Sequence, residues 1–133
     1  MEKKDILTRR DLTILVDSFY EKVKSDSLLG PVFSYVNWAK HLPVMYNFWC
    51  SMLLGEGSYK GSPLQPHLHL PIGREHFDQW LRLFNETVDE KFFGAKADET
   101  KLRAEAIAGV FQHKMGLMKP DLKHEEGPNF FTN

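Results

Sequence analysis

Four segments of the chain repeat their apolar residues with the spacing of an amphipathic α-helix, and this pattern constrains the fold more than any other feature. Apolar residues three and four apart share one helix face, which must be buried against other helices. The expected helices run from about Thr8 to Asp26, from between Asn37 and Leu42 to about Leu54, from about Arg74 to Val88, and from Asp98 or Thr100 to about Lys119. No run alternates convincingly like a β-strand, so the sequence predicts an all-α fold.

The apolar faces of these segments define the predicted core. Thr8 and Asp11 have the spacing of a capping box at the start of the first helix. The third helix presents Phe77, Trp80, Leu81, Phe84 and Val88. The fourth presents Leu102, Ala106, Ile107, Val110, Phe111 and Met115. A length of 133 residues fits one domain, which we expect to span residues 1–119, followed by a flexible polar tail at 120–133.

Composition excludes several classes of partner. Lys plus Arg is 17 and Asp plus Glu is 18, so there is no excess of positive charge for neutralising nucleic-acid phosphates. The apolar runs are too short to span a bilayer, and the charged start at Met1–Asp5 does not resemble a signal peptide. A single cysteine, Cys50, allows no internal disulfide. We therefore expect a cytoplasmic protein that binds neither nucleic acid nor membrane.

The segment between the second and third helices carries a histidine in an unusual setting. Pro66 and Pro71 limit any helix there to about one turn, and His67 lies inside it. Such a short turn is poorly suited to building a core but well suited to presenting a ligand. His67, His69 and His76 together could mimic a zinc cluster, but no cysteine pair or carboxylate at a familiar ligand spacing accompanies them. We expect His69 and His76 to lie on the surface.

Aromatic residues are abundant, at 13% of the chain, and a flat ligand would give these rings a surface to cover. Each ring also has an ordinary structural interpretation. Tyr20 could be a packed tyrosine whose hydroxyl is hydrogen-bonded to backbone, and Trp80 lies on an apolar stripe and could be plain core. Trp38 and Trp49 are interpreted as packing residues.

Six blocks in a fixed order resemble the group III truncated haemoglobins. They are Phe19–Val23, Leu29–Phe33, Asn47–Trp49, Met52–Tyr59, Pro66–Pro71 and Trp80–Phe84. The similarity in order and spacing extends from about residue 10 to residue 114. The resemblance implies a truncated globin, a two-over-two helical sandwich around haem b (iron protoporphyrin IX).

The resemblance also implies roles for individual residues. His67 is similar in position to the proximal iron ligand, and Tyr20, His41 and Trp80 to the distal residues that stabilise a bound diatomic ligand. Each such hydrogen bond is worth roughly 1–3 kcal/mol in a dry pocket. Pro43 departs from the family pattern: if it begins the second helix, His41 precedes that helix, and if the helix begins near Asn37, Pro43 lies inside and kinks it.

The remaining haem contacts are also inferred from matching positions. Phe33 would wedge the haem face, and apolar lining would come from Phe19, Met45, Phe48, Leu70, Phe77 and Phe84. The expected partners of the haem propionates are Tyr59, Lys60 and Arg74.

Three functions remain open from the sequence. The first is reversible binding of O2, CO or NO at haem iron. The second is a haem-dependent redox enzyme, either a nitric oxide dioxygenase or a peroxidase-like enzyme, which would need a separate reductase because no flavin or nicotinamide domain is present. The third is a globin-shaped interaction module that has lost its cofactor.

Overall fold

The computed structural model describes residues 3–34, 36–55, 57 and 72–115. Its four helices are α1 (Arg9–Ser25), α2 (Trp38–Leu54), α4 (Arg74–Lys91) and α5 (Ala95–Lys114). The described residues contain no β-strand, only an isolated bridge between Lys4 and Phe92. The predicted all-α fold is therefore confirmed. The expected tail at 120–133 lies outside the described residues.

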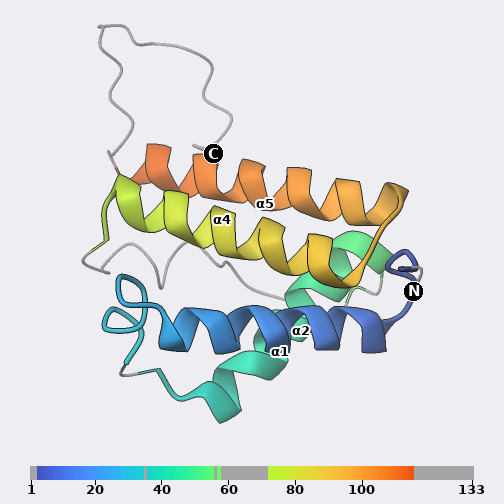
Figure 1. Cartoon of the computed structure of the whole chain (residues 1–133), viewed down its shortest axis with the longest axis horizontal. Helices are drawn as coiled ribbons and strands as arrows, with labels where there is room; N and C mark the ends of the chain where they lie inside the picture. The colour runs from blue at the N-terminus through green and yellow to red at the C-terminus, as the bar shows by residue number, and fades with distance from the viewer. Residues whose placement is uncertain (1–2, 35, 56, 58–71, 116–133) are drawn as a thin grey trace, which may run out of the picture.

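The helices form two packed pairs (Figure 1). α4 lies beside α5 with its chain direction reversed, and α2 crosses α1. α1 also packs along α4, which joins the two pairs into one body. None of the described helices is long and apolar enough to cross a membrane.

Both α1 and α2 begin at a side-chain cap. The Asp11 N–H donates to Thr8 Oγ1 at 3.2 Å and the Thr8 N–H donates to Asp11 Oδ2 at 3.0 Å, so the predicted capping box is present. In α2, Asn37 Oδ1 accepts from the Lys40 N–H at 3.3 Å. Because this cap starts the helix at Trp38, Pro43 lies inside α2. His41 is thus a helical residue, and its N–H donates to Asn37 O at 2.9 Å.

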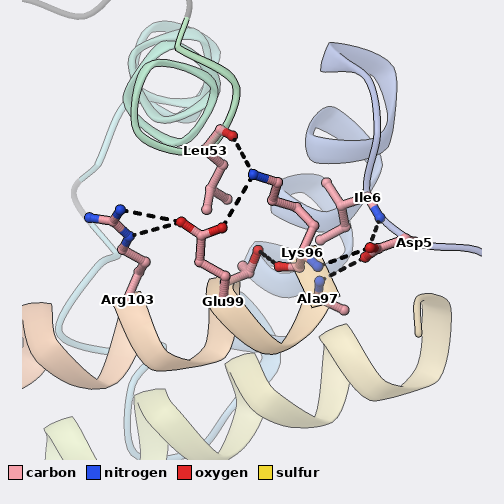
Figure 2. A network of polar contacts seen from close by, with 8 residues as sticks. Asp5, Ile6, Leu53, Lys96, Ala97, Glu99 and Arg103 are labelled. Atoms are coloured by element: carbon pink, nitrogen blue, oxygen red, sulfur yellow. Dashed lines mark hydrogen bonds and ion pairs between the residues drawn. The ribbon is translucent and has the colours of Figure 1, made fainter. Parts of the chain in front are cut away.

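The start of α5 differs from the prediction because a distant residue caps it. Asp5 Oδ2 accepts from the Lys96 N–H at 2.9 Å and Oδ1 accepts from the Ala97 N–H at 2.8 Å (Figure 2). These bonds satisfy two helix-terminal donors that would otherwise lack partners, so α5 begins at Ala95 instead of at Asp98 or Thr100. Gly94 precedes it with φ +148°. A Cβ at Gly94 would lie 2.4 Å from Asp5 Cγ, so the approach of Asp5 requires a glycine here.

The predicted inner face of the last helix was partly wrong. Leu102 is 66% exposed and Ala106 is also exposed. The buried face consists of Ala97, Thr100, Ala104, Ala108 and Phe111. Four of these five side chains are small, which lets α5 approach its neighbours closely. A search for large apolar residues at helical spacing underestimates such a face.

A stack of aromatic rings forms the centre of the core. Phe84, fully buried, lies parallel to Trp80 at a centroid distance of 5.6 Å and to Trp49 at 5.0 Å. Phe19 meets Phe84 edge-on at 5.1 Å and Trp80 at 5.5 Å. Offset and edge-to-face arrangements of this kind are favourable aromatic geometries. α1, α2 and α4 therefore meet in one rigid wall, and Trp80 belongs to it.

Candidate functional site

All four helices contribute to an open pocket that encloses ≈ 770 Å³ of empty space, part of it continuous with solvent. Apolar and aromatic side chains dominate its lining. The lining residues are Tyr20, Leu29, Phe33, His41, Met45, Phe48, Trp49, Ile72, His76, Phe77, Trp80, Ile107, Ala108 and Phe111. Pockets with an apolar and aromatic lining and a few placed polar groups are typical of cofactor and small-molecule sites.

The pocket brings together many of the residues singled out from the sequence. Those that line it are Tyr20, Phe33, His41, Met45, Phe48, Phe77 and Trp80. Phe19 and Phe84 stand behind the lining, with the Phe19 ring 4.8 Å from that of Tyr20, and support the wall from within the core. Arg74 is exposed and outside the lining. Tyr59, Lys60, His67 and Leu70 lie outside the described residues.

Tyr20 and Trp80 form a polar corner inside this apolar pocket. The indole N–H of Trp80 donates a hydrogen bond to the Tyr20 hydroxyl. Burial raises the pKa of Tyr20 far above its ordinary value, and the hydrogen bond from Trp80 offsets only part of that rise. The phenol is thus neutral throughout the physiological range. A hydroxyl that accepts from one neighbour keeps its own proton for donation.

His41 faces the same corner from α2. Its ring centroid lies 6.0 Å from that of Tyr20 and 5.6 Å from that of Trp38, and the side chain is half-buried in the pocket lining. Trp38 is covered on its outer side by Lys24, whose Nζ lies 5.4 Å from the ring centroid. Pro43 therefore does not keep His41 away from the pocket.

The turn after α1 supplies one wall of the pocket and is tied to α4. Asp26 Oδ2 accepts from the Leu28 and Leu29 N–H groups at 3.0 and 2.9 Å, and Oδ1 accepts from Gln79 Nε2 at 2.6 Å. Desolvation opposes ionisation of Asp26, but these hydrogen bonds outweigh it and lower its pKa. A Cβ at Gly30 would lie 2.7 Å from the Asp26 carbonyl oxygen, so this close turn requires glycine. These hydrogen bonds hold Leu29 in the pocket lining.

The expectation that His76 lies on the surface was wrong. Its side chain is only 15% exposed and lines the pocket. Nδ1 of His76 accepts from the Gly73 N–H at 2.9 Å, which is one half of a capping box at the start of α4. Gly73 is the N-cap of α4 and His76 is its third helical residue, and this spacing is the sequence signal that could have indicated the hydrogen bond between them.

Sequence reasoning assigned no site role to six further lining residues. They are Leu29, Trp49, Ile72, Ile107, Ala108 and Phe111. Ile107 and Phe111 were on the predicted inner face of the last helix, but the apolar period cannot distinguish a residue facing the core from one facing a pocket. In the part of the chain that the structure describes, His, Cys, Asp and Glu form no group of three or more that could hold a metal ion.

Comparison with known proteins gives concordant matches. Residues 6–115 match the family model described as bacterial-like globin. The group 3 truncated hemoglobin ctb of Campylobacter jejuni is 37% identical over 120 residues, which cover 85% of this chain and 94% of that protein. Group 1 truncated hemoglobin GlbN of a Nostoc species is 26% identical over 97 residues, covering 72% of this chain and 80% of that protein.

The fold comparison agrees with the sequence matches. The crystal structure of group III truncated hemoglobin from Campylobacter jejuni superposes with a TM-score of 0.79 and 36% identity. The match covers 86% of this chain and 95% of that one.

Proposed function

Because the chain belongs to the bacterial-like globin family and resembles its group III truncated haemoglobins, we propose that it binds haem b in the pocket between its helices and reversibly binds O2, CO or NO there. Globin membership implies haem binding as such. The identity of the haem, the gas ligands and the assignment of His67 as the proximal iron ligand belong to the proposal.

The residues present fit such a group. The pocket has the apolar, aromatic lining that a flat hydrophobic cofactor needs, with Phe33, Phe48 and Phe77 among its walls. Polar groups are few and gathered mainly in one corner. When bound, haem would supply an iron atom able to take a diatomic ligand. His67, on its proline-bounded segment, is the residue we propose to hold that iron.

The observation that carries the proposal is the Tyr20–Trp80 pair. The Trp80 N–H fixes the Tyr20 oxygen, and the raised pKa of Tyr20 keeps its proton in place. The phenol is therefore a preorganised donor toward a partly negative small ligand in the pocket. A hydrogen bond of this kind is worth roughly 1–3 kcal/mol where water is excluded, and about 1.4 kcal/mol corresponds to a factor of ten in affinity.

His67→Ala, with His69→Ala as a matched control two residues away, tests the proposed iron ligand. After haem reconstitution, we expect His67→Ala to lose haem or its normal axial ligation, because the substitution removes the imidazole that we propose to bind the iron. His69→Ala should keep the wild-type haem content and absorption spectrum. An unchanged spectrum for His67→Ala would defeat the assignment.

A second candidate function is a haem-dependent redox enzyme, and His41 is the observation that favours it. Its half-buried imidazole faces the pocket beside Tyr20 and can move a proton where a phenol alone cannot. A peroxidase-like enzyme would reduce H2O2 to two water molecules with two protons and two electrons, the electrons coming from a separate reductase in a cytoplasmic setting, whereas conversion of NO and O2 to nitrate takes one electron and no proton. Turnover of H2O2 by the haem-loaded protein that is lost in His41→Leu would support the peroxidase-like enzyme; equal rates in the two proteins would count against it.

A further inference from the structure

His76 is a second histidine in the pocket, and neither the polar corner nor the proposed iron ligand uses it. It lies in the first turn of α4, four residues before Trp80, so both side chains project from the same side of the helix. The lining residues next to it in sequence and on α5 are apolar: Ile72, Phe77, Ile107, Ala108 and Phe111. A polar ring in such a lining needs a partner there.

The hydrogen bond from Gly73 determines which ring nitrogen carries the proton. The Gly73 N–H donates to Nδ1 at 2.9 Å, so Nδ1 must keep its lone pair free. The neutral imidazole then carries its proton on Nε2. Glu75 Oε2 lies 3.9 Å from the same Nδ1, is on a largely exposed side chain, and is beyond hydrogen-bonding distance. His76 is thus a donor through Nε2.

The edge of the ring that bears Nε2 is the one left for the pocket. Nδ1 is turned to the backbone at the start of α4, while the side chain as a whole is 15% exposed and lines the pocket. The structure shows no acceptor for Nε2–H among the residues it describes. A donor in an apolar wall indicates an acceptor on the molecule that fills the pocket.

We propose that His76 binds the haem by donating its Nε2–H to a propionate carboxylate. This inference rests on the proposed function. A haem offers hydrogen-bond acceptors only at its iron ligand and at its two carboxylates. Tyr20 and Trp80 are the expected partners of the iron ligand, and His76 lies four residues, about 6 Å along the axis, nearer the N-terminal end of α4. Arg74, exposed at that same end, would add positive charge on the solvent side.

Two substitutions separate this role from helix capping. The side-chain oxygen of asparagine can occupy the place of Nδ1, so His76→Asn keeps the acceptor for Gly73 but loses the donor to the pocket. The amide nitrogen of glutamine can occupy the place of Nε2, so His76→Gln keeps the donor but loses the cap. We expect His76→Asn to release haem about tenfold faster than wild type, measured by transfer to apomyoglobin, and His76→Gln to stay near the wild-type rate.

The same measurement with haem dimethyl ester identifies the acceptor. Esterification removes the carboxylate charges and leaves only the weaker ester carbonyl acceptors, so the difference in release rate between wild type and His76→Asn should shrink with the ester, as a double-mutant cycle measures. Equal rates with ordinary haem, or a difference that is just as large with the ester, would overturn the proposal.

A spectroscopic test needs no substitution. In the diamagnetic carbon monoxide complex, ¹⁵N–¹H correlation should show the proton of the His76 imidazole on Nε2, and a proton on Nδ1 instead would also overturn the proposal. Failure of the wild-type protein to bind haem at all would refute the proposed function itself. The two failures are therefore distinguishable.

Discussion

Asp5 is expected to stabilise the fold from outside every helix, and Asp5→Ala tests this. Its carboxylate accepts three backbone hydrogen bonds, from Ile6 and Ala97 at 2.8 Å and from Lys96 at 2.9 Å. Two of these cap α5, and loss of a helix cap costs about 1–2 kcal/mol. The third bond is local to the buried Ile6. We expect a loss of about 2 kcal/mol in the free energy of unfolding.

Thermal unfolding followed by circular dichroism measures this loss. For a chain of this size about 2 kcal/mol corresponds to a Tm lower by roughly 6 °C. Asp78→Ala is a suitable control, because Asp78 is an exposed residue of α4 with no hydrogen bond or ion pair to any residue that the structure describes. If Asp5→Ala and Asp78→Ala unfold at the same temperature, the reasoning about the α5 cap is refuted.

The pH dependence provides a second check on the same residue. Desolvation opposes ionisation of Asp5, but the hydrogen bonds from Lys96, Ile6 and Ala97 and the Lys96 charge outweigh it and lower its pKa below the ordinary 3.8. A lowered folded-state pKa means that the stabilisation is fully present above the unfolded-state pKa and is lost as pH falls through the folded-state value. The gap in Tm between wild type and Asp5→Ala should therefore be constant near pH 7 and shrink below about pH 4.

Further substitutions probe the site and the helix junction. Tyr20→Phe should speed oxygen dissociation about tenfold by removing one donor, and Trp80→Phe should speed it by releasing the Tyr20 hydroxyl. Met45→Leu, a volume-conserving change in the same lining, should leave the dissociation rate unchanged. If stopped-flow measurements show unaltered oxygen dissociation rates for both Tyr20→Phe and Trp80→Phe, the proposed role of the polar corner is refuted. Gly94→Ala should lower the Tm at least as much as Asp5→Ala, because its Cβ would collide with Asp5 and its φ of +148° disfavours alanine; a wild-type melting curve would contradict this.

The sequence predicted the helices best where the determining interactions are local. Thr8 and Asp11 cap α1 within one turn, so their spacing alone placed the start of that helix correctly. The start of α5 depends on Asp5, 91 residues before Lys96, and no local pattern reports such a contact. Leu102 was misassigned because the buried face of α5 is made of small residues, which carry little hydrophobic signal.

The site illustrates the same limit. Family resemblance led to Tyr20, His41 and Trp80, and the structure places all three in one pocket lining. Whether His41 belonged to a helix depended on the Asn37 cap competing with Pro43 as the starting point, a balance that the sequence left open. His76 was missed because a polar residue in the first turn of a helix normally faces solvent, whereas its side chain is only 15% exposed and lines the pocket.

The visible absorption spectrum of the purified protein after haem reconstitution tests the central claim most directly. It should be recorded in the ferric, dithionite-reduced and carbon monoxide-bound forms. Haem in this pocket predicts a strong Soret band that shifts on reduction and shifts again with carbon monoxide. A featureless spectrum from protein that remains helical by circular dichroism would contradict the account, and the chain would then be a globin-shaped interaction module without a cofactor.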